Sequence, residues 1–201
     1  MTETMRMIDE VGPLTEEQLE ACTQAARAAL KEPTSRPIMM AYEMVRGVLK
    51  GTKTQTRRGA RNLKRCPFGS VGEQLWVRET WAVWPPESKA QSDVVYRADI
   101  SDLREESVVA LAKGGKQHTP WISSMFMPRW ASRLQLEITE IRLEHVQEIS
   151  EADALCEGVD GISPIESYAK LWDELNARRP GNWAWKDNPW VWAISFRRLQ
   201  P

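Results

Sequence analysis

The sequence predicts an α+β fold: a small, partly open β-barrel with short helices at its ends, preceded by a helical extension. Two patterns indicate this fold. Several segments alternate or run apolar as strands do, and a few short segments between them carry apolar residues at helical spacing. Strands interleaved with few helices, and with no internal repeat, favour a single α+β domain.

The composition is that of an ordinary globular domain, with 42% hydrophobic and 27% charged residues among 201. The 27 basic and 28 acidic residues nearly cancel, so the net charge indicates neither a membrane partner nor a general nucleic-acid coat. The sequence shows no apolar run of membrane-spanning length and no secretory signal. Three scattered cysteines, with no disulfide pattern, favour a cytoplasmic location.

Several chemistries are excluded by what the sequence lacks. Two histidines, His118 and His145, and the scattered cysteines have no zinc-binding spacing. The motifs GxSxG, GxxxxGK(S/T) and GxGxxG are also missing, which argues against the common hydrolase, NTPase and dinucleotide-binding folds. We therefore predict no metal ion and no cofactor.

The domain organisation follows from changes along the chain. Residues 1–36 are predicted to form an N-terminal helical extension, because Thr15 and Gln18 make a capping box before a segment rich in helix formers. Residues 37–201 form the main domain. Within it, residues 85–127 are a long irregular stretch, interpreted as an insertion with a short helix around Leu103–Ala112.

The elements of the main domain are predicted from their periodicity. Strands are expected at residues 37–40, 53–58, 75–84, 94–98, 133–149 (one long strand or a hairpin) and 188–199. Helices are expected at residues 41–50, stopped by Gly51, at residues 150–158, closed by Gly158, and at residues 168–178, with Leu171, Trp172 and Leu175 facing inward.

The residues from Arg46 to Arg65 include eight bases and no acid: Arg46, Lys50, Lys53, Arg57, Arg58, Arg61, Lys64 and Arg65. Such a local positive field suits a phosphate or an anionic intermediate. The alternative is a solvated charged surface at a helix end and a strand edge.

Tryptophan is unusually frequent, with ten residues against three phenylalanines and three tyrosines. A buried indole needs a partner for its N–H, so tryptophan is an odd choice for a core. Indoles beside basic residues are used to stack on nucleobases. We expect most of the ten to be core residues and one or two to line a base pocket.

The segment Gly51–Arg58, G-T-K-T-Q-T-R-R, resembles the signature G-x-K-x-x-(E/T)-x-R of ASCH domains, which are PUA-like β-barrels. The order of the surrounding segments is similar too: a helix before it, then GEQLWV, RLQLEITEI, SEADALCEG and WVWAISFRRL. The resemblance covers about Pro37–Leu199. The whole layout is also similar to uncharacterised phage and prophage ASCH-like proteins.

Thr56 stands where most ASCH domains have glutamate, and in this the sequence resembles the small bacterial N4-acetylcytidine amidohydrolases. The resemblance implies Lys53, Thr56 and Glu157 as catalytic residues, because A-L-C-E-G matches their A-x-x-E-N. The chain departs from that pattern in having Gly158 in place of asparagine and about twice the length.

The chemistry of these residues can be examined independently. A threonine hydroxyl needs an adjacent base, and Lys53 would serve if it were neutral, since burial and the neighbouring Arg57 and Arg58 lower its pKa. Glu157 would protonate the leaving amine or the ring nitrogen, and Arg58 or a backbone N–H would face the oxyanion. The structural alternatives are a solvent lysine, a strand threonine and a surface glutamate.

One geometric condition applies to the catalytic hypothesis. In a regular strand, Lys53 and Thr56 point to opposite faces of the sheet. The catalytic hypothesis therefore requires a bend over Gly51–Thr54, which Gly51 permits.

We therefore predict a metal-independent amidohydrolase for N4-acylated cytosine nucleosides, or for a related modified base, with the modified cytidine as its partner. The residues predicted to bind the substrate are Arg58, Arg78, Glu79 and Trp81; a salt bridge is the alternative for Arg78 and Glu79. The alternative function is an RNA- or modified-nucleotide-binding module, or a ribonuclease, that uses the same basic strand without amide hydrolysis.

Overall fold

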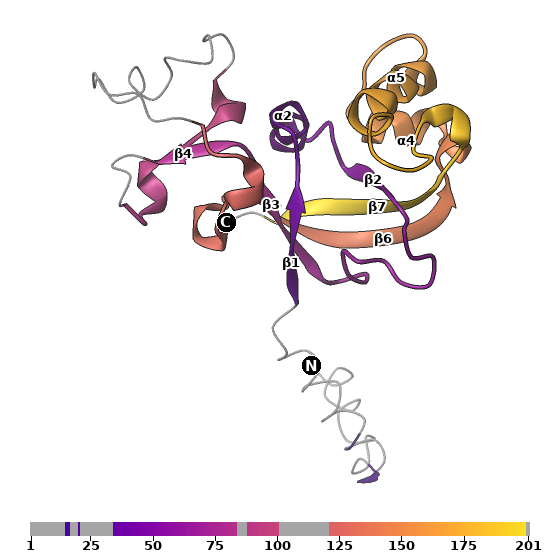
Figure 1. Ribbon diagram of the computed structural model, residues 1–201. Helices are drawn as coiled ribbons and strands as arrows, with labels where there is room; N and C mark the ends of the chain where they lie inside the picture. Colours follow the sequence, from indigo (N-terminus) through magenta and orange to yellow (C-terminus); the bar gives the residue numbers. More distant parts are fainter. Residues whose placement is uncertain (1–14, 17–19, 21–33, 84–87, 101–120, 200–201) are drawn as a thin grey trace, which may run out of the picture. The chain divides into compact units, whose positions relative to one another are not determined.

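Figure 1 shows the computed structural model of the chain, which describes residues 15–16, 20, 34–83, 88–100 and 121–199. The chain divides into two units, Met1–Pro33 and Thr34–Pro201, and the elements below all belong to the second. Nearly all of the predicted extension over residues 1–36, and the whole helix predicted around Leu103–Ala112, lie outside the described residues.

A five-stranded mixed sheet in the order β1-β3-β6-β7-β2 organises the second unit. β1 pairs with β3 in parallel, and the other neighbours pair antiparallel. The sheet is not closed, because β1 and β2 remain its two edges. The α+β class and the partly open sheet are thus confirmed. The strand bounds are Ser35–Met39 (β1), Gln55–Gly59 (β2), Gln74–Arg78 (β3), Gln135–His145 (β6) and Trp190–Leu199 (β7).

The longest ladder joins β6 to β7. Residues 133–149 were predicted to form one long strand or a hairpin, and the structure has one strand there. β6 is a single strand of 11 residues that pairs with β3 near its start and with β7 along its length. A β-bulge between Ile138 and Glu140 shifts the register. A bulge bends a strand and increases its local twist.

The strand predicted over residues 75–84 is in fact two strands. β3 ends at Arg78 in the main sheet, and β4 (Trp81–Val83) pairs with β5 (Val94–Tyr96) in a separate two-stranded sheet. The two apolar runs are separated by Arg78 and Glu79, and Glu79 is buried against the guanidinium of Arg133. The apolar pattern alone did not reveal that the chain passes from one sheet to the other at Arg78 and Glu79.

Among the described residues, three α-helices lie beside the sheet: α2 (Tyr42–Lys50), α4 (Glu151–Cys156) and α5 (Pro164–Asn176). α2 packs on the main core, in which Val45 and Val48 meet apolar residues of the sheet. α4 and α5 share a second core with the start of β7, built from Val146, Ile149, Ala154, Tyr168, Trp172 and Val191. In Figure 1, α2 stands on one side of β2 and the α4–α5 pair on the other.

The inward face of α5 differs from the prediction in one residue. Tyr168, Trp172 and Asn176, each four residues apart, are buried, and Leu171 is half-buried. Leu175 is 48% exposed and not inward. Contacts with α4 and β7 select this row, and Leu175 lies at its margin.

No helix of the described part of the chain is both long and apolar enough to cross a membrane.

Truncating a core side chain tests this packing. Leu136→Ala should lower the free energy of unfolding by about 2–5 kcal/mol, because Leu136 is fully buried in β6 and its removal leaves a cavity. Leu63→Ala is the matched control, since Leu63 is 47% exposed and its loss should change stability by less than about 0.5 kcal/mol. Urea denaturation measures both; equal losses would contradict this core assignment.

Candidate active site

Lys53 and Glu157, which are 104 residues apart in sequence, form a buried ion pair. The ammonium of Lys53 donates to Oε2 of Glu157 over 2.7 Å and to the backbone carbonyl of Glu157 over 2.8 Å. The two side chains are only 1% and 3% exposed. Both charges have therefore left water, and each depends on the other for compensation.

The bend required before β2 is present. α2 stops at Gly51, whose φ of 78° is left-handed, and the amides of Thr52 and Lys53 both donate to the carbonyl of Gly47. β2 begins only at Gln55, so Lys53 is not part of the regular strand. The amide of Thr54 also donates to the carbonyl of Cys156 over 2.9 Å, which ties this bend to the end of α4.

Two glycines make room for the lysine. A Cβ on Gly47 would lie 3.0 Å from the Cβ of Lys53, and a Cβ on Gly158 would lie 3.2 Å from the same atom. Gly158 also has a left-handed φ of 85°, a conformation that glycine and asparagine adopt more readily than other residues. The departure from asparagine at Gly158 thus keeps this backbone conformation accessible.

Glu157 is positioned by the end of α4. Ser150 caps the start of this short helix by accepting from the amide of Asp153, and Glu157 is its C-cap. The last carbonyls of a helix lack intrahelical partners. The ammonium of Lys53 satisfies the carbonyl of Glu157, and the amide of Thr54 satisfies that of Cys156. A lysine at this end also suits the helix dipole.

Arg57 holds the other oxygen of Glu157. Its Nη1 lies 3.3 Å from Oε1 of Glu157, while Nε and Nη2 donate to Glu144 and Nη2 also reaches Asp153 over 3.1 Å. The guanidinium is fully buried and lies over the ring of Tyr168, 5.9 Å from its centroid. Arg142 in turn pairs with Glu144 and Asp153. Buried charges of both signs are thus compensated in one network.

The surroundings of the site lower the pKa of Lys53 and raise the pKa of Tyr168. Burial lowers the pKa of Lys53; the carboxylate of Glu157 opposes this, and the guanidinium groups of Arg58 and Arg57 add to it. Burial is the largest cause of the lowered pKa of Lys53. The cationic neighbours, which the sequence also indicated, contribute less. Burial and the nearby Glu157 raise the pKa of Tyr168 well above its usual range, so its hydroxyl keeps its proton.

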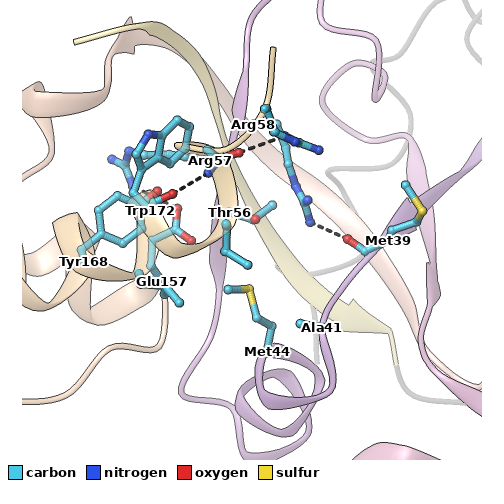
Figure 2. Close-up of a pocket in the computed structure, with 13 residues that line it drawn as sticks. Met39, Ala41, Met44, Thr56, Arg57, Arg58, Glu157, Tyr168 and Trp172 are labelled. Atoms are coloured by element: carbon cyan, nitrogen blue, oxygen red, sulfur yellow. Dashed lines mark hydrogen bonds and ion pairs between the residues drawn. The ribbon is translucent and has the colours of Figure 1, made fainter. Parts of the chain in front are cut away.

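Thr56 lines a cavity of about 130 Å³ together with Glu157. Figure 2 shows Thr56 between Glu157 and Arg58, with Met44 of α2 below it. The hydroxyl groups of Thr56 and Tyr168 form no hydrogen bond with the described residues, although both side chains line the cavity. The remaining lining residues are Met39, Ala41, Met44, Arg57, Arg58, Leu171, Trp172, Leu175, Asn176 and Arg179.

Lys53 lines a second hollow of about 320 Å³, which shares Glu157, Met44 and Leu171 with the first. Lys53 and Thr56 therefore meet at Glu157, one through a hydrogen bond and the other through the common cavity. Glu157 thus lines both hollows, whereas Thr56 lines only the first and Lys53 only the second.

The residues predicted to bind the substrate are divided. Arg58 lines the cavity and donates to the carbonyl of Met39, and Arg78 lines an adjoining groove and donates to the carbonyl of Met127. Glu79 is buried and paired with Arg133, as the salt-bridge alternative expected. Trp81 is buried in a small cluster against Trp130. Glu79 and Trp81 do not line these hollows, and we leave them out of the proposed site.

Sequence reasoning missed four residues around this site. Glu144, Asp153, Tyr168 and Trp172 come from β6, α4 and α5, and no local pattern marks them as partners of Arg57 or as cavity residues. The signal available was indirect: the alternation of β6 places Glu144 among its polar positions without indicating its partner. The indoles beside the site are Trp172 in the cavity and Trp183 in the adjoining groove.

The basic window from Arg46 to Arg65 is not one charged surface. Lys53 and Arg57 are buried in ion pairs, and Arg46 donates to two backbone carbonyls. The exposed members are Lys50, Arg61, Lys64 and Arg65. Three of the eight bases, Lys53, Arg57 and Arg58, line the site, Arg46 is bound elsewhere, and the other four face solvent.

No group of three or more histidine, cysteine, aspartate or glutamate side chains is arranged to hold a metal ion within the described part of the chain.

Comparison with known proteins found similarity at the level of solved structures. No family model matches the chain, and no curated protein matches it. A protein from Enterococcus faecalis V583, described under the family model DUF984, aligns over 92% of this chain and 94% of its own at 12% identity, with a TM-score of 0.44. An ASCH domain from Lactobacillus crispatus JV V101 aligns over 92% and 95% at 11% identity, with a TM-score of 0.41. At these values, activity has to be sought in the geometry of the site itself.

Removing the carboxylate of Glu157 tests the buried pair. Glu157→Gln should lower the free energy of unfolding by about 3–5 kcal/mol at neutral pH, because the buried ammonium of Lys53 loses its counter-charge. The loss should shrink at alkaline pH, where Lys53 gives up its proton. Glu140→Gln is the control: Glu140 pairs with Arg142 but is 53% exposed, so about 1 kcal/mol or less is expected. Urea titrations with equal losses for both variants would refute the assignment.

Proposed function

We propose that the protein is an amidohydrolase that removes acyl groups from N4-acylated cytosine nucleosides, with N4-acetylcytidine as the representative substrate. One observation carries this proposal: the glutamate of a buried lysine–glutamate pair lines a cavity in which a threonine hydroxyl has no hydrogen-bond partner among the described residues. Strongly perturbed buried groups beside a cavity are typical of catalytic sites. The motif resemblance of Lys53, Thr56 and Glu157 to such enzymes supports the same conclusion.

In the proposed first step, neutral Lys53 takes the proton of the Thr56 hydroxyl through one intervening water, since the two groups share no direct hydrogen bond, while Oγ1 bonds to the acyl carbon. The electron pair of the C=O bond moves onto oxygen. The proton then passes from Lys53 to Glu157 along their 2.7 Å hydrogen bond and on to the leaving N4 amine as the C–N bond breaks. This leaves cytidine and a threonyl ester.

In the second step, water attacks the ester carbonyl and gives its proton to Lys53. The C–O bond to Thr56 breaks as the proton returns to Oγ1, which releases the carboxylic acid and restores the site. The negative oxygen formed in both steps would be stabilised by hydrogen-bond donors in the cavity. The guanidinium of Arg58 and the protonated hydroxyl of Tyr168 are the groups suited to this role.

A binding module without hydrolysis is the second candidate function. It is favoured by the basic residues that line the groove next to the cavity. Binding of a polynucleotide through several such residues loses affinity steeply as salt rises, whereas hydrolysis of an uncharged nucleoside responds little to salt. The salt dependence of RNA binding and of nucleoside turnover therefore separates the two functions.

Replacing the proposed nucleophile gives a direct test. Thr56→Val should reduce conversion of N4-acetylcytidine to cytidine by about 10⁴-fold or more, the scale of loss when a catalytic nucleophile is removed. Thr54→Val is the control, because Thr54 is exposed and lies just before β2. Ultraviolet absorbance follows the reaction. Turnover by Thr56→Val would eliminate the nucleophile assignment, and no turnover by the folded wild-type protein would favour the binding module.

The pH dependence tests the role of Lys53. The reactive form is the neutral amine, and burial lowers the pKa of Lys53 below the 10.5 of an ordinary lysine. The value of kcat/KM should therefore rise with pH and level off below that value. Lys53→Arg should abolish both the rise and the activity, because arginine keeps its proton throughout. A rate that is flat or falls over neutral to alkaline pH would speak against lysine as the base.

A further inference from the structure

A groove of about 430 Å³ adjoins the proposed catalytic cavity. The two hollows share Met39, Arg58 and Arg179, so a ligand seated in one can extend into the other. No aspartate or glutamate is among the described residues that line the groove. Its charged and aromatic lining residues are Arg58, Arg61, Arg78, Arg179, Phe68 and Trp183.

The four arginines of this groove have no carboxylate partner among the described residues. Arg58 and Arg78 donate to the backbone carbonyls of Met39 and Met127, and Arg179 donates to the side-chain oxygen of Asn176. These acceptors are neutral, so none of these guanidinium groups is engaged in an ion pair with a described residue.

Other arginines of the same fold are treated differently. Arg57, Arg133 and Arg142 each pair with at least two carboxylates. Carboxylates thus pair with these three guanidinium groups, whereas no carboxylate of the described residues pairs with an arginine of the groove.

A second observation also points to a ligand. The Nε atom of Arg58 is buried and has no hydrogen-bond partner. A buried guanidinium N–H without an acceptor is costly, and the cost falls when an anion enters and accepts from it. Arg58 also lines both hollows, as Arg179 does.

The aromatic wall of the groove is held in place. The indole of Trp183 lies against Gly59, where any Cβ would overlap its ring. Its Nε1 donates to the carbonyl of Pro180 over 3.0 Å, and its own carbonyl accepts from Nε1 of Trp172 over 2.7 Å. The groove thus joins fixed aromatic surface to several guanidinium groups, a combination that suits a sugar or base with its phosphate.

We propose that this groove binds the phosphate of a nucleotide whose base occupies the catalytic cavity. The preferred acylated substrate is then a cytidine nucleotide, and the free nucleoside binds less tightly. The identity of the base rests on the proposed function, whereas recognition of the phosphate rests on the four arginines alone. The phosphate belongs either to a mononucleotide or to a strand, and the two sources share this chemistry.

Binding of unacylated ligands tests the groove without relying on turnover. Titrations followed by calorimetry would compare cytidine, cytidine 5′-monophosphate and cytidine 3′-monophosphate. At least one monophosphate should bind about tenfold or more tightly than cytidine, the gain expected from one charge-assisted contact to phosphate. The preference should weaken as salt rises. Equal affinity of all three ligands would overturn the proposal.

Two arginine variants test whether the preference for phosphate arises in the groove. Arg61→Gln should remove most of the preference for phosphate and leave the affinity for cytidine unchanged, because Arg61 lines the groove and not the catalytic cavity. Arg65→Gln is the matched control, since Arg65 is exposed in the same segment and does not line the groove. Equal losses in both variants would indicate a general positive field and overturn the assignment of a groove site.

A short oligocytidylate distinguishes the two sources of phosphate. Affinity equal to that of the monophosphate supports a mononucleotide, and affinity that rises with length supports a strand; both outcomes place phosphate in the groove. If the protein hydrolyses N4-acetylcytidine but shows no phosphate preference, the groove proposal fails and the proposed function stands. If it prefers the monophosphate but hydrolyses neither acylated nucleoside nor acylated nucleotide, the proposed function fails and the groove stands.

Discussion

The buried ion pair between Lys53 and Glu157 is the contact on which the site depends. It joins the bend after α2 to the end of α4, two segments 104 residues apart, in a place where neither charge can return to water. Separating them would leave an uncompensated charge in the interior, so the two segments are held together. The hydrogen bond from Thr54 to the carbonyl of Cys156 adds a backbone link at the same point.

The same ion pair accounts for two opposite influences on the pKa of Lys53. Desolvation favours the neutral amine, whereas the carboxylate 2.7 Å away favours the ammonium. Arg57 weakens the second influence, because it takes the other oxygen of Glu157 and adds positive charge nearby. Glu144 and Asp153 in turn stabilise Arg57, so the proton affinity of Lys53 is set by a network that spans β2, β6 and α4.

The protein is nearly neutral overall, but the fold concentrates positive charge around one groove. Of the eight bases between Arg46 and Arg65, two are neutralised inside the fold, while Arg58 and Arg61 join Arg78 and Arg179 around one groove. These four arginines come from three separate parts of the chain, and the fields of the three parts add only because the fold brings them together. An anionic group on a ligand would be drawn to the groove beside the cavity.

The sequence by itself determined the features that depend on neighbouring residues: the amphipathic helix ending at Gly51, the cap at Ser150, the closing strand and the α+β class. The motif around Lys53 and Thr56 also identified the site to examine. Only the tertiary structure decided the division of residues 75–84 between two sheets, the exposure of Leu175, and the placement of Glu144, Tyr168 and the groove arginines. Periodicity and capping are local and can be read along the chain, whereas the partner of a buried charge is chosen by contacts between segments far apart in sequence.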